Sequence, residues 1–253
     1  MEFYLDTSNE EQLLKLFETN FNNLDVLSFL RNVLVNYPYI MDDKDYSKEE
    51  YIDVLLNKFK VDTSKENVKA IINNYLLPGF SLLKENEIEE NPYFQNIKFS
   101  NTLYKEWKIN YSSFKKNEPF VFRSHISLED DYYREIPQIG YFSKNVNYPA
   151  IYQNDNMWMS VTPNEIYTMK EPINKAYGRC LTFGLGLGYF AYMVSNKNNV
   201  DEVVIIEKDE SVISLFKQQI LPKFNCKYKI HIIHDDALRY IMNDMNFIFT
   251  IKF

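Results

Sequence analysis

Apolar and polar residues recur with helical spacing over the first 77 positions of the chain. Two helices are expected, over residues 10–20 and 22–35. Tyr37-Pro38 should end the second, because proline disfavours a helical conformation in the residue before it. The apolar positions are Leu13, Leu14, Leu16 and Phe17 in the first helix, and Leu24, Leu27, Phe29 (or Leu30) and Leu34 in the second.

Ser47-Lys-Glu-Glu50 has the sequence of a capping box and predicts the start of a third helix. Thr63 or Ser64 is expected to cap a fourth, which Pro78-Gly79 ends. The apolar faces of these two helices are Ile52, Leu55, Leu56 and Phe59, and Val68, Ile71, Ile72, Tyr75 and Leu76. Residues 1–80 are therefore expected to form an all-helical module whose apolar stripes pack together, with a role over a substrate or in a dimer left open.

Short alternating or apolar runs replace the helical pattern over residues 81–161. They predict a small β-rich segment, punctuated by Pro149 and by a polar run at 153–156. The expected strands include Trp107–Tyr111, Phe120–Phe122, Ile139–Phe142, Ala150–Tyr152 and Met157–Val161. Thr162-Pro163 then resembles a helix start with proline at the first helical position, and Pro172 should interrupt that helix after Lys170.

From Gly178 onward, strands and helices alternate. Strands are expected at 179–183, 202–207, 229–234 and 246–251, and helices follow the first three, with Asp209 as the cap of the second. The run Glu202–Glu207 is almost entirely apolar, as in a parallel strand covered on both faces. Residues 162–253 are thus predicted to form an α/β domain with a partial parallel sheet at the C-terminus.

Composition narrows the classes of partner. The net charge is −7, and no dense Lys/Arg run is present, so nucleic acid is not expected as a ligand. No stretch approaches the roughly 20 apolar residues of a membrane helix, and the first residues lack the pattern of a signal peptide. We therefore expect a cytoplasmic protein without membrane contact. The abundance of Lys, Asn and Ile indicates an AT-rich bacterial genome.

The cysteines and histidines do not form a metal-binding pattern. Cys180 and Cys226 stand outside any ligand spacing, and Cys180 falls in an apolar run typical of a core. His231 and His234 are three residues apart in an expected strand, so their side chains should point to opposite faces. No metal is expected.

The strongest candidate site is the glycine loop Gly184-Leu-Gly-Leu-Gly188 between a strand and a helix. Missing side chains let a ligand approach the backbone closely, and the helix start offers unpaired N–H groups. The dinucleotide fingerprint GxGxxG would need glycine at position 189, where this chain has Tyr189. A tight turn without a ligand is the alternative interpretation.

Two acidic positions accompany the loop. Glu207 ends the second strand, 207 − 188 = 19 residues after the last glycine, where a carboxylate can accept hydrogen bonds from ribose hydroxyls. Asp235 and Asp236 follow the third strand, and one of the two should be an N-cap. Ligands of open α/β sheets bind outside the carboxyl ends of the strands, so these positions should converge.

Three motifs in order resemble those of class I S-adenosylmethionine-dependent methyltransferases: Leu181–Gly188, Val203–Lys208 and His234–Ala237. The run Met159–Tyr192 is similar to the spermidine-synthase-like branch, in which a β-rich segment precedes a Rossmann-like domain. The resemblance implies S-adenosylmethionine as cofactor and a small molecule as substrate. The helical module lies outside it.

Residue by residue, the resemblance implies that the glycines contact the methionine part of the cofactor and that Glu207 binds the ribose. Asp236 and Ala237 would contact the adenine, with Asp235 as the competing choice. The expected cofactor-binding set is Phe183, Gly184, Leu185, Gly186, Gly188, Glu207, Lys208, Asp235, Asp236 and Ala237.

No catalytic residue is assigned. The family has an acidic residue at the end of the fourth strand, and Asn246–Ile251 offers none there. The family's complete sheet also has more strands than this chain supplies. The expectation is therefore a methyltransferase, or an inactive relative shortened after its fourth strand.

Two other classes of function remain open. An aminopropyltransferase would need acidic residues around a polyamine, and Asp130 and Asp131 are candidates. A non-catalytic nucleoside-binding or assembly protein would cover the edge of its unfinished sheet, through a homodimer built on the C-terminal strand. A nicotinamide oxidoreductase is disfavoured by Tyr189.

Overall fold

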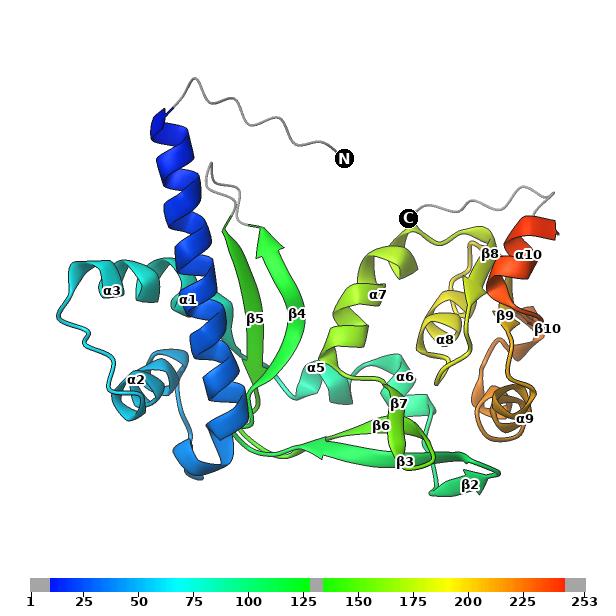
Figure 1. The fold of residues 1–253 in the computed structure, drawn as a ribbon. Coiled ribbons are helices and arrows are strands. Elements are labelled where there is room, and N and C mark those ends of the chain that lie inside the picture. The colour runs from blue at the N-terminus through cyan, green and yellow to red at the C-terminus, as the bar shows by residue number, and fades with distance from the viewer. Residues whose placement is uncertain (1–9, 128–133, 244–253) are drawn as a thin grey trace. The chain divides into compact units, whose positions relative to one another are not determined.

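The computed structural model describes residues 10–127 and 134–243 of the 253-residue chain. Within these residues it is a mixed α/β protein with three sheets, in which parallel and antiparallel pairings both occur. The chain divides into two compact units, Met1–Leu83 with Lys115–Val146, and Lys84–Phe114 with Asn147–Phe253. The β-rich segment expected over residues 81–161 thus contributes to both units (Figure 1).

The first unit combines the helical module with a small sheet. Its elements are α1 (Glu10–Ile40), α2 (Lys48–Lys58), α3 (Glu66–Ile71), a π-helical turn (Ile72–Leu76), α4 (Leu77–Gly79), β1 (Phe80–Leu82), β4 (Phe120–Ser127) and β5 (Glu135–Tyr141). The strand order is β1-β5-β4, with β1 parallel and β4 antiparallel to β5.

The core of this unit joins the helices to the sheet. The Tyr51 ring on α2 stacks on Tyr141 of β5 with ring centroids 4.0 Å apart, and its hydroxyl donates to the carbonyl of Asn117 at 2.8 Å. Val26, Leu30 and Val33 of α1 are buried in the same cluster. Burial raises the pKa of the Tyr51 hydroxyl far above its ordinary value, so this phenol stays neutral and serves as a hydrogen-bond donor.

Three sequence-based boundaries in the helical module are corrected. Residues 10–40 form one continuous helix, because no glycine or proline interrupts it between the two expected segments. Pro38 lies inside its last turn, where few intrahelical hydrogen bonds remain to be lost. The N-cap of α3 is Lys65, because the Ser64 hydroxyl donates to Asp62 at 2.6 Å instead of capping the helix.

The expected capping box of α2 is confirmed. The Ser47 hydroxyl accepts from the backbone N–H of Glu50 at 3.2 Å, and the Glu50 carboxylate accepts from the N–H of Ser47 at 2.9 Å. These two reciprocal bonds satisfy backbone donors that the helix itself leaves unpaired.

The second unit holds two sheets and the helices around them. Its elements are α5 (Asn86–Glu89), α6 (Pro92–Asn96), β2 (Thr102–Tyr104), β3 (Trp107–Phe114), β6 (Val146–Gln153), β7 (Asn156–Ser160), α7 (Pro163–Lys175), β8 (Gly178–Phe183), α8 (Tyr189–Ser195), β9 (Val200–Glu207), α9 (Glu210–Gln219), 3₁₀ turns at Leu221–Lys223 and Lys227–Lys229, β10 (Ile230–His234) and α10 (Ala237–Asn243).

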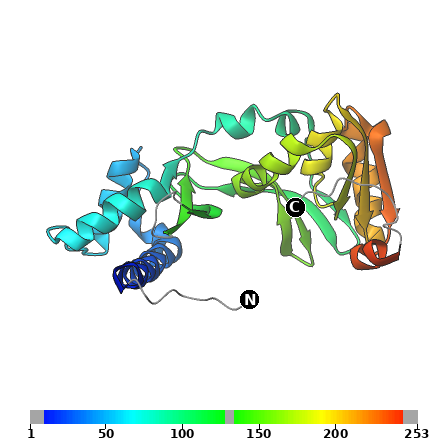
Figure 2. The same ribbon diagram turned by 90° about the horizontal axis from the view of Figure 1, so that it is seen from above.

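The described strands of the second unit include those expected near residues 107–111, 150–152, 157–161, 179–183, 202–207 and 229–234. β2-β3-β6-β7 form one sheet, with antiparallel pairing of β2 with β3 and of β6 with β7. β10-β9-β8 form a parallel sheet (Figure 2). Its middle strand β9 is buried over Val203–Ile206, as its uninterrupted apolar run predicted. The expected fourth strand at 246–251 lies outside the described residues.

Helix α7 is longer than expected and contains Pro172. The proline lies near the C-terminal end, so only the last turn loses a hydrogen bond. The ammonium group of Lys197 donates to the carbonyls of Ile173 and Asn174 at 2.6 and 2.9 Å, which adds hydrogen bonds to acceptors in the last turn of the helix. Across the described ranges, no helix is both long and apolar enough to cross a membrane.

Candidate functional site

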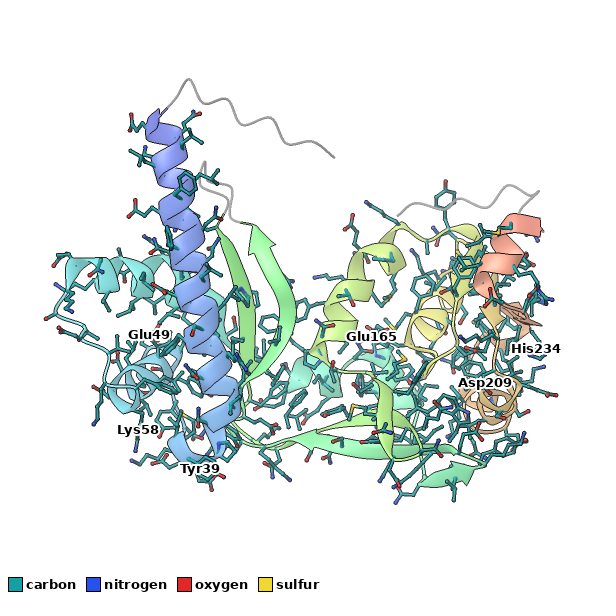
Figure 3. All side chains as sticks on the ribbon, viewed as in Figure 1. Tyr39, Glu49, Lys58, Glu165, Asp209 and His234 are labelled. Carbon is teal, nitrogen blue, oxygen red and sulfur yellow. The ribbon has the colours of Figure 1, made fainter. Side chains whose placement is uncertain are left out.

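The three sequence motifs meet at one edge of the parallel sheet. Phe183 of β8 pairs in register with Ile206 of β9, and His234 of β10 pairs with Glu207. Because the strands are parallel, the glycine loop, the turn after Glu207 and the turn after His234 all leave the sheet at its carboxyl edge. Figure 3 labels Asp209 and His234 in this region. The expected convergence of the three positions is therefore present.

The glycine loop has a backbone conformation that glycine favours. Gly184, Gly186 and Gly188 have φ values of +83°, +48° and +76°, in or near the left-handed region. The N–H of Gly184 donates to the carbonyl of Ile206 at 2.8 Å, so the loop is joined to β9 at its first residue. Gly188 is the N-cap of α8 and starts that helix.

Among the described residues, only the first glycine of the loop faces open space. A Cβ atom built on Gly184 would have no described neighbour within 4 Å. A Cβ on Gly186 would overlap the sulfur of Met159, and a Cβ on Gly188 would lie 2.7 Å from the Phe216 ring. Internal packing thus favours glycine at position 188, where rigid rings fill the space, whatever the loop binds. At position 186 the flexible Met159 side chain would have to move, and packing places no such demand on Gly184.

Glu207 organises the loop through both carboxylate oxygens. Oε2 accepts from the backbone N–H of Leu185 at 3.0 Å, and Oε1 accepts from that of Asp209 at 2.9 Å. Each carboxylate oxygen has two lone pairs, so one acceptor position on each stays available for a ligand hydroxyl. The half-buried Glu207 side chain links the β8–α8 and β9–α9 turns, which is a structural role that its position at a strand end did not predict.

The two aspartates after β10 have different roles. Asp236 Oδ1 accepts from the N–H groups of Leu238 and Arg239 at 3.0 and 3.2 Å, which is the helix-capping role expected for one of the pair. Asp235 forms an ion pair with Arg239, and the hydrogen bond from that guanidinium lowers the pKa of the Asp235 carboxyl. Both carboxylates therefore hold the start of α10.

The remaining residues of the expected cofactor-binding set also lie at the carboxyl edge of the parallel sheet. Phe183 is partly exposed at the end of β8, and Leu185 is buried within the loop. The carbonyl of Lys208 lies 3.0 Å from His234 Nε2, and Ala237 is the first residue of α10.

Two aromatic residues outside the sequence motifs contact the glycine loop or its end. They are Tyr93 of α6 and Tyr189 of α8. The buried Tyr93 hydroxyl donates to the carbonyl of Leu187 at 2.7 Å. Its ring contacts that of Tyr189 edge-on with centroids 5.3 Å apart, and Asn91 Nδ2 donates to the Tyr189 hydroxyl at 3.2 Å. Only the Asn91-Pro92 helix-start pattern in the sequence could have indicated the position of Tyr93.

Glu165, in the first turn of α7, is a further acidic group near the loop (Figure 3). It is half-buried, and it interacts electrostatically with Tyr93 and Tyr189. Burial raises the pKa of the Glu165 carboxyl. A partly desolvated carboxylate that interacts with Tyr189, the residue after the glycine loop, is a candidate functional group. The Thr162-Pro163 helix start in the sequence would have placed it in a first turn.

The other candidate positions do not join this site in the described residues. Cys180 and Cys226 are free thiols, and His231 lies 3.8 Å from Glu202. No three His, Cys, Asp or Glu side chains gather in metal-binding geometry within residues 10–127 and 134–243. Asp130 and Asp131 fall outside the described residues.

Comparison with models of protein families finds no match for this chain, and a search of curated proteins finds no relative. Inferences about function therefore rest on the geometry of the chain itself.

Proposed function

We propose that the carboxyl edge of β8, β9 and β10 binds S-adenosylmethionine and that the protein transfers the methyl group to a small molecule. The observation that carries the proposal is the combination of an open face at Gly184 with the Glu207 carboxylate next to it in the fold. An open backbone surface beside an acceptor of hydroxyl hydrogen bonds suits the ribose and the adjoining chain of an adenosyl ligand.

The order of the strands supports the same proposal. β10-β9-β8 corresponds to the order 3-2-1 with which a doubly wound Rossmann-type sheet begins, and such sheets bind nucleotides at the carboxyl ends of these strands. The space available for a cofactor differs among the three glycines. Gly184 offers free surface, whereas the side-chain space of Gly186 and Gly188 is filled by Met159 and Phe216.

The protein's part in methyl transfer would be to bind and align. The sulfonium group of S-adenosylmethionine supplies an already activated methyl group. The chain must hold the acceptor in line with it and keep water out. Gly184 and Glu207 would position the cofactor, and no residue of the described chain is assigned to remove a proton from the acceptor.

A second candidate function, aminopropyl transfer to an amine, is favoured by Glu165. Its carboxylate is partly desolvated near the glycine loop. An ammonium group of an amine substrate would offset the cost of that buried negative charge. Incubation with decarboxylated S-adenosylmethionine and putrescine tests this candidate, and absence of an aminopropylated product rejects it.

Calorimetry of the full chain with S-adenosylmethionine and with S-adenosylhomocysteine tests the main proposal. We expect binding to the wild type and at least tenfold weaker binding to Glu207→Gln. The glutamine side chain has one acceptor oxygen, whereas the Glu207 carboxylate has two that can accept hydrogen bonds from the ribose hydroxyls. Glu202→Gln is the matched control on the same strand, because Glu202 pairs with Arg179 far from the carboxyl edge. No heat from the folded wild type at millimolar ligand would reject the proposal.

A further inference from the structure

Helix α1 has two apolar faces, and only one of them packs inside its own unit. Val26, Leu30 and Val33 belong to the buried core. On the opposite side, Leu14, Phe17, Phe21 and Leu24 are 68%, 57%, 68% and 63% exposed. We call these four residues the α1 stripe. A large exposed apolar surface of this kind marks an interaction site more often than an ordinary solvated face.

The spacing of the α1 stripe identifies the kind of partner. The four residues follow one another at intervals of three, four and three, which are the a and d positions of a heptad repeat. Leu27, at position g beside them, is 45% exposed, so the exposed apolar face is wider than an a/d seam alone. Apolar a, d and g positions pair with a helix of the same spacing, which makes a second helix the complementary surface.

The residues beside the α1 stripe allow two copies of this chain to pair. With Leu14 and Phe21 at position a, Glu18 occupies position e and Leu13 and Asn20 occupy position g. In a parallel pair, position e of one helix lies against position g of the other, so Glu18 would face Leu13 and not a second acid. Within residues 14–24, like charges consequently do not oppose this pairing. The same register places Glu10 and Arg31 at position d, where each would meet the same charge on the other copy, so the pairing is confined to this segment.

The available area suits a weak dimer. Exposed fractions of this size on two phenylalanines and two leucines correspond to about 450 Å² per copy, taking roughly 150–250 Å² for a large apolar side chain. Two copies would bury about 900 Å², which is near the lower limit of roughly 1,000 Å² for a specific interface.

We infer that the α1 stripe is a self-association surface through which two copies of this chain form a helix-paired dimer. In Figure 1 the first turns of α1 extend beyond the ends of α3 and β4. The inference is independent of the proposed cofactor, because the α1 stripe lies in the first unit and the glycine loop in the second.

Sedimentation velocity of the full chain over roughly 1–200 µM tests the inference. We expect a monomer–dimer equilibrium with a dissociation constant in the micromolar range, and at least tenfold weaker association for Phe17→Gln/Phe21→Gln. Glutamine retains high helix propensity, so circular dichroism should show unchanged helicity. Leu103→Gln is the control, since it removes an exposed apolar side chain outside the α1 stripe and should leave association unchanged.

Three results would overturn the inference. A wild type that stays monomeric at 200 µM shows no self-association. A dimer that survives the double substitution is built on another surface, such as the strand that the sequence predicts at 246–251. A monomer that the double substitution destabilises towards urea covers the α1 stripe with another part of its own chain. Slower hydrogen exchange of residues 14–24 at high protein concentration would support the helix-paired dimer.

Discussion

Replacement of single glycines separates the role of the loop in folding from its role in binding. Gly184→Ala and Gly178→Ala form a matched pair, because both residues have positive φ, +83° and +60°, and a Cβ on either has no neighbour within 4 Å in the described part of the chain. Gly178 begins β8 and Gly184 follows its end, so the two lie about 20 Å apart at 3.3 Å per residue. Only Gly184 is at the proposed ligand edge.

Both substitutions should destabilise the fold by about 1–2 kcal/mol, the cost of a left-handed conformation for a residue with a Cβ. Gly188→Ala adds overpacking against Phe216 and Phe224, about 1–3 kcal/mol, for a total of about 2–5 kcal/mol. In ligand binding the matched pair should differ. The new methyl group of Gly184→Ala projects into the space proposed for the cofactor and should weaken binding by at least tenfold, while Gly178→Ala should bind as the wild type does.

Urea unfolding measures the loss of stability, and isothermal titration calorimetry with S-adenosylhomocysteine measures affinity. Equal affinities of Gly184→Ala and wild type would refute the reasoning that the open face of Gly184 is the ligand surface. Equal loss of affinity in Gly184→Ala and Gly178→Ala would show a general effect on the sheet. A Gly188→Ala protein as stable as the wild type would refute the packing argument.

Two further predictions concern stability. Burial raises the pKa of the Glu165 carboxyl in the folded state above its unfolded value of about 4.3. The contribution of the protonated carboxyl to the free energy of unfolding is therefore fully present below pH about 4.3, and it is lost as the pH rises through the folded-state pKa. Glu165→Gln should therefore be more stable than wild type at pH 7 in urea unfolding, with the difference closing towards pH 4; a constant difference would contradict this. Ser47→Ala should lower the free energy of unfolding by about 1 kcal/mol, because it removes the capping box of α2. Ser64→Ala should lower it by less than about 0.5 kcal/mol, because the Ser64 hydroxyl caps no helix. Equal losses for the two variants would disprove the capping role of Ser47.

Local signals in the sequence were sufficient for many elements. The apolar run of β9, the Asp209 cap of α9 and the Ser47-Glu50 capping box are each set by a few adjacent residues, and the structure has all three where they were expected. The convergence of the glycine loop with Glu207 follows from parallel strand topology alone. The two proline positions were misjudged, because the cost of proline depends on how many helical hydrogen bonds lie beyond it.

By itself, the sequence determined that residues 10–35 are helical with apolar positions at helical spacing, although it predicted two helices where the structure has the single helix α1, and that the loop after β8 contains three glycines. It could not decide which apolar face of α1 is buried, because helical periodicity places residues on faces but does not identify the face that meets the core. Nor could it distinguish the glycines. Met159 and Phe216 are distant from the loop in sequence, and only tertiary packing brings them onto Gly186 and Gly188 and leaves Gly184 open. Contacts between residues far apart in the chain leave no local pattern, and such contacts define the free surface of this site.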